Sequence, residues 1–261
     1  MSAYIDDMFS LVGKVAVTIG SGGVLGGAMA EALGRAGARV AVLDLDAGAA
    51  EERARGIRDA NGTDAIDIQV DATSETDLRN ACDQVVAEWG RVDILLNAPG
   101  INSATPFFDI SLDEWERVLR VNLTSMHLAC QVFGRQMVDQ GKGGSVINIS
   151  SASSGPPLSK VFTYSVTKAG VNNLTQFLAR EWAPHGVRVN AVAPGFFPAE
   201  QNRKILTEER VATIMGHTPM ERFGEPEELA GAVVWLAAER ASSFVTGAII
   251  RVDGGFTAMT I

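Results

Sequence analysis

The stretch VAVTIGSGGVLGGAMAEALGR, residues 15–35, joins an apolar run to a glycine-rich turn and then to a segment in which apolar residues recur at helical spacing. It predicts a strand at Val15–Ile19 and a helix at Ala28–Arg35. A strand, a glycine turn and a helix N-terminus together suit a pyrophosphate, because glycines allow close backbone approach while free amides and the positive helix end attract the anion. We therefore expect a dinucleotide phosphate site at Gly20, Gly22, Gly23, Val24, Leu25 and Gly26.

The same alternation continues along the chain, where short apolar runs separate longer amphipathic segments. Such a rhythm indicates βαβ units, and fully apolar strands suit a parallel sheet that helices cover on both faces. The predicted fold class is α/β, a doubly wound parallel sheet of the Rossmann type in a single domain, residues 1–261. Further strands are expected at Val40–Leu43, Ile66–Val70, Val92–Leu96, Val146–Ile149, Val187–Val192 and Ala248–Val252, and further helices at Ser74–Trp89, Ser111–Val138 and Ala169–Trp182.

One long interval, from Pro194 to Glu225, fits neither the strand period nor the helix period and is rich in Pro, Gly and charge. Long loops in compact domains tend to carry function. We expect residues 195–225 to form a lid over the active site. Of the three histidines, His217 falls in this lid.

Composition restricts the partners of the chain. The net charge is -9 and the pI is near 4.9, which disfavours nucleic acid and anionic lipid. No stretch approaches the roughly 18 apolar residues of a transmembrane helix, and residues 1–10 lack the basic and apolar regions of a signal peptide. Cys82 and Cys130 are far apart, which predicts neither a disulfide nor a metal site. We expect a cytoplasmic protein whose partner is a small molecule, with no membrane contact.

Two carboxylates follow predicted strands and refine the nucleotide site. Asp44 closes the second strand, where an acidic side chain accepts hydrogen bonds from the adenosine ribose and repels a 2′-phosphate. This favours NAD over NADP. Asp71 follows the third strand and is suitably placed for the adenine edge, although it could instead cap the helix that starts near Ser74.

Several motifs resemble, in the same order, those of the short-chain dehydrogenase/reductase family over residues 12–256. The family's Thr-Gly-x-x-x-Gly-x-Gly fingerprint is similar to residues 19–26, where Ile19 replaces Thr and Val24 replaces the middle Gly. The terminal motifs of the family resemble Pro194-Gly195, Val245-Thr246-Gly247 and Val252-Asp253-Gly254-Gly255, although Ala199 stands where the family has Thr. Its Asn-Asn-Ala-Gly motif is similar to Asn97-Ala98-Pro99-Gly100, which lacks the second Asn.

The resemblance implies a nicotinamide cofactor and the interconversion of an alcohol and a ketone, with Asn122, Ser151, Tyr164 and Lys168 as the catalytic residues. A Tyr has a pKa of about 10, so a cation one helical turn away, Lys168, is expected to lower the pKa of Tyr164. In the family, Lys also holds the nicotinamide ribose, Ser holds the substrate oxygen and Asn holds a water. Ser150 is a close competitor for the serine role, but the interval of 13 positions from Ser151 to Tyr164 suits the family better. Further expected cofactor contacts are Ala72, Asn97, Ala98, Pro194, Gly195 and Phe197, beside Tyr164 and Lys168.

Three short segments, residues 23–30, 193–203 and 217–220, are also similar to bacterial sugar-acid oxidoreductases of the D-mannonate (fructuronate) type. This similarity implies a sugar acid or a related polyol as substrate, and family relatives are commonly homotetramers. The carboxylate of a sugar acid needs a cationic partner, which Arg203 or Lys160 could supply. The expected substrate residues lie in loops at the carboxyl ends of strands: Asn102, Ser103, Lys160, Gln201, Asn202 and Arg203.

Two alternatives stay open at the level of the sequence. The same reaction could act on a hydrophobic alcohol, a steroid or an acyl thioester, although the polar loop residues favour a sugar. A nucleotide-binding regulator without turnover is the other alternative, to which the altered residues Ile19, Val24, Ala98 and Pro99 give some weight.

Overall fold

The computed structural model describes residues 3–156, 158–198 and 206–259. In this part of the chain, seven parallel strands form one sheet in the order β3-β2-β1-β4-β5-β6-β7. The chain begins at a central strand, builds outward on one side and then crosses over to build the other side, which is the doubly wound topology. The strands are β1 (Val15–Ile19), β2 (Arg39–Asp44), β3 (Ala65–Gln69), β4 (Ile94–Asn97), β5 (Gly144–Ile149), β6 (Val187–Pro194) and β7 (Ile249–Val252).

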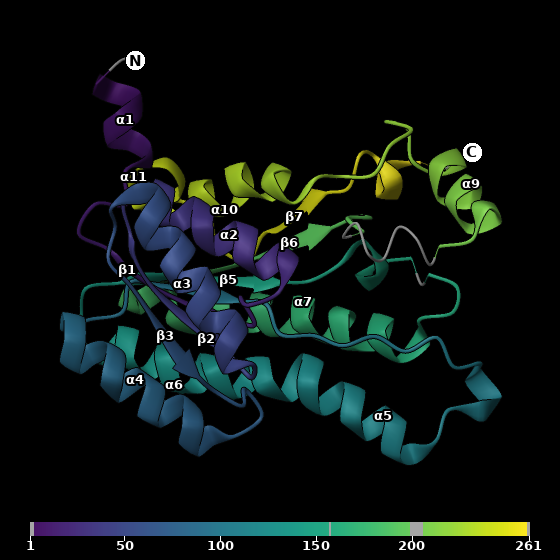
Figure 1. Ribbon diagram of the computed structural model, residues 1–261, viewed down its shortest axis with the longest axis horizontal. Coiled ribbons are helices and arrows are strands. Elements are labelled where there is room, and N and C mark those ends of the chain that lie inside the picture. Colours follow the sequence, from purple (N-terminus) through teal and green to yellow (C-terminus); the bar gives the residue numbers. More distant parts are fainter. Residues whose placement is uncertain (1–2, 157, 199–205, 260–261) are drawn as a thin grey trace.

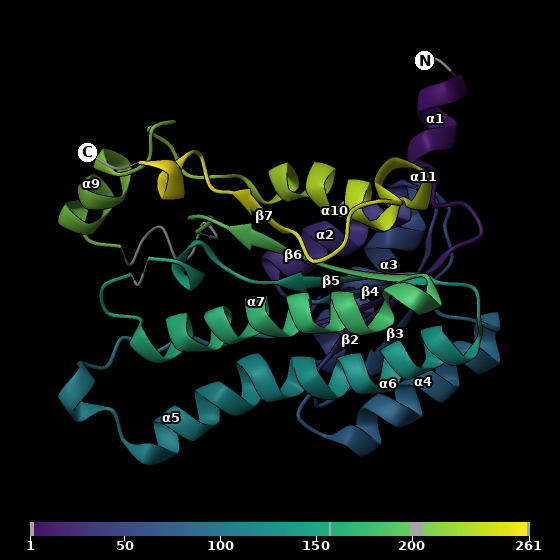
Figure 2. The ribbon, with the colours of Figure 1, turned by 180° about the vertical axis from the view of Figure 1, so that it is seen from behind.

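Helices cover both faces of the sheet, as Figures 1 and 2 show. Each face of the sheet has its own buried cluster of apolar side chains, which lies between the strands and the helices on that face. No helix in the described ranges is long and apolar enough to cross a membrane. One face carries α2 (Val24–Arg35), α3 (Ala47–Asn61) and α10 (Ala230–Ala237), and the other carries α4 (Glu75–Trp89), α6 (Ser125–Asp139) and α7 (Phe162–Trp182).

The remaining helices mark the two ends of the molecule. Figure 1 shows α5 (Leu112–Leu119) and α9 (Glu208–Gly216) beyond the carboxyl ends of the strands. At the opposite end, α1 (Ala3–Phe9) packs against α11 (Glu239–Ser242). The loops that connect strands to helices therefore gather at the end that α5 and α9 flank, which is where ligands bind in sheets of this kind.

All seven predicted strands are present, with bounds that differ by at most two residues, but several helix predictions were wrong. α2 begins at Val24 rather than Ala28, and α7 begins at Phe162 rather than Ala169. The sequence pattern missed α3, because Ala50 and Ala54 supply most of its buried face and such small side chains give a weak apolar signal. The interval from Pro194 to Glu225 is not a continuous loop, since α9 lies within it.

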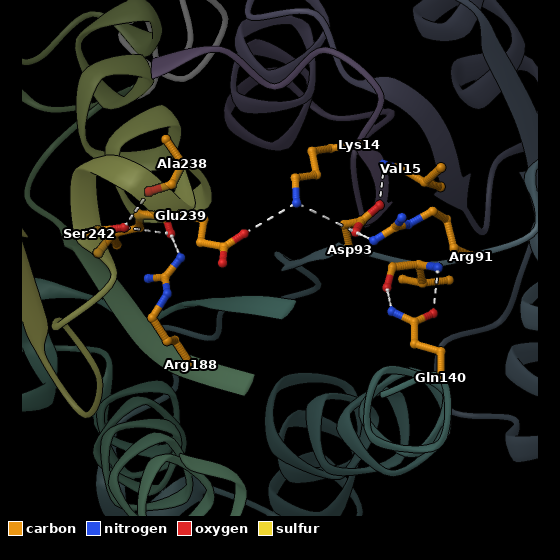
Figure 3. A network of polar contacts seen from close by, with 11 residues as sticks. Lys14, Val15, Arg91, Asp93, Gln140, Arg188, Ala238, Glu239 and Ser242 are labelled. Carbon is orange, nitrogen blue, oxygen red and sulfur yellow. Dashed lines mark hydrogen bonds and ion pairs between the residues drawn. The ribbon is translucent and has the colours of Figure 1, made fainter. Parts of the chain in front are cut away.

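A buried carboxylate fastens the strands at their amino ends (Figure 3). Asp93 is 4% exposed, and its Oδ2 accepts a hydrogen bond of 2.9 Å from the backbone N–H of Val15 at the start of β1. Arg91 pairs with the same carboxylate, and Lys14 bridges it to Glu239 of α11, at 4.0 Å and 3.4 Å. This end of the sheet is thus tied together by polar contacts, which leaves the carboxyl end for function.

Candidate active site

The glycine turn after β1 is tight because two of its residues have no room for a side chain. Gly20 has φ +72°, and a Cβ there would lie 2.9 Å from the backbone of Pro99. A Cβ on Gly26 would overlap the carbonyl oxygen of Gly20 and lie 2.9 Å from Ser21 Cα. The first turn of α2 therefore folds back against the end of β1, and only glycine permits both approaches.

The N-terminus of α2 differs from those of three helices that follow. Asp46, Ser74 and Ser111 cap α3, α4 and α5 with side chains that accept hydrogen bonds from backbone amides. In contrast, α2 starts after Gly23, which has no side chain to cap it. Beside it, the hydroxyl of Ser21 is fully buried and has no hydrogen-bond partner among the described residues. Uncapped amides and an unpaired hydroxyl fit the pyrophosphate of a dinucleotide.

Asp44 connects the end of β2 to this turn. Its Oδ2 accepts a hydrogen bond of 2.9 Å from Gly22 N–H, and its Oδ1 accepts one of 3.1 Å from Asp46 N–H. A Cβ on Gly22 would lie 3.0 Å from the same carboxylate, so the turn rests directly on it. The negative charge expected to select the ribose is therefore fixed at the rim of the turn.

Asp71 does not cap α4, because the N-cap is Ser74. The Oδ1 of Asp71 instead accepts hydrogen bonds of 2.8 Å from both the N–H and the hydroxyl of Thr73, within its own loop. Ala72, beside it, is half-buried and packs against the core. The structure therefore excludes the capping role, and the contact of Asp71 with an adenine edge stays a prediction.

The side chain of Asn97 faces the interior rather than the nucleotide turn, and the place of this residue among the cofactor contacts stays a prediction. The residue is fully buried, and its Nδ2 donates hydrogen bonds of 3.3 Å to the carbonyl of Met126 and to Oδ1 of Asn148. It joins β4 to β5 and α6 behind the site. Ala98, the next residue, is half-buried, and its N–H donates to the Ile19 carbonyl at 3.0 Å.

The early start of α7 brings Tyr164 and Lys168 onto one helix, as the spacing predicts. Lys168 is 3% exposed, and its Nζ lies 5.5 Å from the centroid of the Tyr164 ring. The ammonium donates a hydrogen bond of 2.7 Å to the carbonyl of Ile149 at the end of β5. Burial lowers the pKa of Lys168 to about 8, because a charged amine loses its hydration there.

The structure brings Ser151, and not Ser150, to Tyr164. The hydrogen bond from Ser151 lowers the pKa of Tyr164, but burial has the larger effect and raises that pKa above its usual value. The expectation that Lys168 brings the pKa of Tyr164 down was therefore wrong for this geometry. Ser150 points elsewhere, with its hydroxyl 3.3 Å from the Lys168 carbonyl. Near neutral pH the phenol is protonated, which is the form that can give a proton to a substrate oxygen.

Asn122 lies in a π-helical turn, Arg120–Thr124, that joins α5 to α6 where the sequence predicts one continuous helix. Such bulges often occur at functional sites. The Asn122 amide accepts from the N–H of Ile101 and donates to its carbonyl, both at 2.8 Å. A Cβ on Gly100 would lie 3.7 Å from Asn122 Oδ1 and 3.7 Å from Lys168 Nζ, so both polar groups converge on this glycine.

The expected substrate residues in the described ranges come from two loops. Asn102 accepts a hydrogen bond of 2.8 Å from Ser103 N–H, and the Ser103 hydroxyl donates to Glu114 of α5. Thr105 donates to the same carboxylate at 2.9 Å. Glu114, which the sequence analysis did not single out, thus fixes this loop; the signal for it was its place three residues after the helix cap Ser111. Gln201, Asn202 and Arg203 lie outside the described residues.

The second loop precedes α7 and meets α9. Lys160 is exposed and has φ +69°, an uncommon conformation for a side-chain-bearing residue. Its neighbour Ser159 accepts a hydrogen bond of 2.7 Å from Arg210 of α9. Figure 1 shows α9 at this end of the molecule, near the start of α7. Part of the predicted lid therefore contacts the loop that leads to Tyr164.

The residues after β6 line a cavity between the sheet and the described part of the predicted lid. Gly195 follows β6, and a Cβ there would lie 2.7 Å from Asp253 Cα, so the chain passes close to the end of β7. Phe197 and Thr218 line a cavity of about 560 Å³ next to it. His217 contacts the ring of Phe256, with 4.8 Å between ring centroids, which gives it a packing role.

Comparison with known proteins gives consistent matches. The family described as enoyl-(acyl carrier protein) reductase matches residues 22–257. An uncharacterized oxidoreductase of Bacillus subtilis, UxuB, is 38% identical, and the alignment covers 95% of this chain and 96% of that protein. Both matches extend over nearly the whole length of the chain.

Solved structures agree with the sequence matches. A gluconate 5-dehydrogenase from Burkholderia cenocepacia, in complex with NADP and tartrate, superposes with a TM-score of 0.92 at 34% identity and covers 98% of this chain and 100% of that one. A candidate D-mannonate oxidoreductase from Haemophilus influenza with bound NAD has a TM-score of 0.92 at 35% identity, covering 98% and 99%. With its parallel sheet, glycine turn and Tyr-Lys helix, this chain belongs to the short-chain dehydrogenase/reductase family of oxidoreductases.

Proposed function

We propose that this chain is an NAD(H)-dependent dehydrogenase that interconverts an alcohol and a ketone on a sugar acid or a related polyol. The observation that carries the proposal is that Ser151, Tyr164 and Lys168 meet at the carboxyl ends of the strands, as does the uncapped turn before α2. An acid/base group and a dinucleotide site at one edge are what hydride transfer to a carbonyl requires.

The chemistry divides between the cofactor and the chain. A bound nicotinamide supplies or accepts the hydride. In reduction, Tyr164 gives its phenolic proton to the substrate oxygen, since burial keeps the phenol protonated. Ser151 donates a hydrogen bond to that oxygen and stabilises the charge that develops on it. Lys168, with a pKa of about 8, changes protonation near neutral pH and so suits the return of the proton, with Asn122 beside it at Gly100.

The choice of NAD rests on the charge around the adenosine end. Asp44 and Asp46 lie at the end of β2 and the start of α3, with exposed Leu45 between them. No Lys or Arg occurs from residue 44 to residue 50. A 2′-phosphate would meet two carboxylates and no cation in this stretch, whereas ribose hydroxyls can donate to Asp44.

The sugar-acid assignment is supported by the polar loops at the carboxyl ends of the strands. It is also supported by the two solved relatives, a gluconate 5-dehydrogenase and a candidate D-mannonate oxidoreductase. A specific observation favours the hydrophobic alternative as the second candidate. Phe107 is 61% exposed and meets Phe162 edge to face at 5.0 Å between centroids, two residues before Tyr164. Such an aromatic surface beside the candidate site could bind a steroid or an aliphatic alcohol.

We further propose that residues 195–225 act as a lid and that the chain works as a cytoplasmic homotetramer. The contact between Arg210 and Ser159 supports the lid. Exposed apolar side chains on α5 and α7, such as Leu112 and Phe177, support self-association. Both cysteines are free and buried, which suits a reducing compartment. Sedimentation equilibrium checks the assembly, and a monomer would contradict it.

A turnover screen tests the proposal. Wild-type protein is mixed with NAD+ or NADP+ and with sugar acids, neutral polyols, aliphatic alcohols and steroids, and the absorbance of the reduced cofactor is followed. Sugar acids or polyols with NAD+ should react, and Tyr164→Phe should bind NADH normally but lose turnover. Reaction with apolar alcohols alone would support the second candidate, and NADH binding without any turnover would support a regulator.

A further inference from the structure

Asn172 contacts both flanks of Ser151 from the helix that carries Tyr164 and Lys168. The Ser150 hydroxyl donates a hydrogen bond of 2.6 Å to Asn172 Oδ1, and Asn172 Nδ2 donates one of 2.8 Å to the Ser154 hydroxyl. Asn172 lies one helical turn after Lys168 on α7. One amide therefore connects the residue before Ser151, and a residue three positions after it, to the catalytic helix.

The bonds of Ser151 itself do not provide this connection to the helix backbone. Its hydroxyl accepts from the N–H and the hydroxyl of Ser153 at 3.2 Å and 3.1 Å, both within the same short loop. These bonds orient the hydroxyl within the loop. The backbone of α7 is reached by the hydroxyl of Ser150, 3.3 Å from the Lys168 carbonyl, and Asn172 adds contacts to both Ser150 and Ser154. The Ser154 hydroxyl, in turn, donates to the carbonyl of Ser151 at 2.7 Å. The hydrogen bond from Asn172 to Ser154 therefore connects Asn172 to the backbone of Ser151 through one side chain.

Three side chains on the same face of α7 make hydrogen bonds to β5 or to the residue that follows it. Lys168 binds the Ile149 carbonyl, Asn172 binds Ser150, and Thr175 accepts from Asn148 Nδ2 at 3.0 Å. Lys168 and Thr175 reach positions at or before the end of the strand. Among these three side chains, Asn172 is the one that also reaches beyond Ser151 to the loop on its far side.

We propose that Asn172 is a positioning residue that holds Ser151 at hydrogen-bonding distance from Tyr164 by fixing Ser150 and Ser154 to α7. It does not touch the reacting atoms. Its effect passes through the Ser151 hydroxyl to the Tyr164 phenol, and the proposal rests on the dehydrogenase function only for its kinetic consequence. The state of the phenol can be measured without any substrate.

The chain contains two tyrosines, Tyr4 and Tyr164, which makes that measurement direct. Tyrosine labelled with ¹³C at Cζ gives two NMR signals that respond to ionisation, and Tyr4→Phe leaves Tyr164 alone. In this background, Asn172→Ala should raise the pKa of Tyr164 by about 0.5 to 1, because a hydrogen bond to the phenolate is weakened. The titration is compared over the pH range in which circular dichroism shows the fold intact.

Asn173→Ala is the matched control, since Asn173 is the adjacent residue on α7 and its side chain is exposed. It should leave the Tyr164 signal unchanged. Ser151→Ala should raise the pKa as Asn172→Ala does, and the double variant should raise it no further than Ser151→Ala alone. Additive rises would show that Asn172 acts by another route and would overturn the proposal, as would a wild-type titration for Asn172→Ala.

Two further readouts complete the test. If Asn172→Ala does not fold, Ser154→Ala removes one of the two contacts from the loop and should give a smaller rise, whereas no rise would contradict the proposal. With an active substrate, Asn172→Ala should lower kcat about tenfold and shift the pH profile upward, with NADH affinity unchanged. Failure of the wild type to turn over any substrate would refute the proposed function, while the NMR titration would still decide the role of Asn172.

Discussion

Burial is the physical condition that the polar side chains of the candidate active site share. Lys168 and Asn122 are 3% and 0% exposed, and the pKa of the Tyr164 phenol is set more by lost hydration than by its hydrogen bond. Each group keeps its polar atoms bonded to the backbone or to a neighbouring side chain, which offsets the cost of removing it from water. The residues are thus held in place by contacts that also determine their protonation.

Replacing Lys168 by Met should stabilise the fold near neutral pH while removing activity. The pKa of Lys168 falls from 10.5 to about 8, so the folded state binds fewer protons than the unfolded state between those values. Stability of the wild type therefore rises with pH across this window, and the cost of the buried charge is full below pH 8. The lowered pKa of Lys168 corresponds to about 3 kcal/mol of unfolding free energy that the buried charge costs. The Met variant regains this amount but loses about 1 kcal/mol with the hydrogen bond to the Ile149 carbonyl.

Urea unfolding at several pH values measures this difference. Lys168→Met should be more stable than the wild type by about 2 kcal/mol at pH 7, and the advantage should disappear as the pH rises from 8 to 10.5. A variant that is less stable at every pH would show that the ammonium is a net stabilising group.

Replacing Asp44 by Asn should weaken the preference for NAD over NADP. The change removes one charge at the rim of the turn while keeping the size of the side chain, so the ratio of kcat/KM for the two cofactors should fall about tenfold, or about 1.4 kcal/mol. Asp67→Asn removes the same charge from an exposed position on β3 and should leave the ratio unchanged. Equal values of kcat/KM with NAD and with NADP in the wild type would contradict the assignment of Asp44.

At the scale of elements, the start of α2 depends on glycine more than on capping. The helices α3, α4 and α5 begin with Asp or Ser caps, whereas α2 begins against the end of β1 at a distance that admits no Cβ at Gly26. The family's middle Gly is Val24 here, and this residue is 50% exposed, so its side chain points away from the tight contact. The departure from the fingerprint is tolerated because it falls on the open side of the turn.

Gly26→Ala should therefore disrupt the turn, whereas a helix glycine with free space should accept the same change. The added methyl overlaps the Gly20 carbonyl, so affinity for NADH should fall at least about tenfold and the Tm should drop. Gly56→Ala, in α3 with no atom within 4 Å of the added Cβ, should instead stabilise the protein by about 0.5–1 kcal/mol. Calorimetry of NADH binding and thermal unfolding compare the two, and equal effects would refute the steric argument.

For the whole molecule, the two ends of the parallel strands differ in function. The glycine turn, the Tyr-Lys helix and the loops lie at the carboxyl ends, while the network around Asp93 lies at the amino ends (Figure 3). Contacts at the amino edge fix β1 relative to β4 and α11, and so they support the site from the opposite end. Substitutions there should change stability and leave chemistry unchanged.

Asp93→Asn tests this separation. The carboxylate is buried and meets Arg91, Lys14 and the N–H of Val15, so its loss should cost about 2–3 kcal/mol of unfolding free energy with kcat unchanged. Asp139→Asn is the control, because the pair of Asp139 with Arg135 is exposed, and its change should stay within about 0.5 kcal/mol. A large loss of kcat in Asp93→Asn would show that the two edges are coupled.

The sequence by itself determined the seven strands, the parallel α/β class, the glycine turn and the spacing of Tyr164 and Lys168, because strand periodicity, backbone freedom and helix pitch are local properties of the chain. Only the tertiary structure decided that Asn97 faces the interior, that Asp71 does not cap α4 and that burial raises the pKa of Tyr164, while it brings to Tyr164 the serine that the sequence favours, Ser151. These outcomes depend on burial and on contacts between segments far apart in the sequence, such as Asn172 with Ser154 or Asn122 with Ile101. Packing of α7 against the end of β5 fixes those contacts, and no local pattern of residues encodes it.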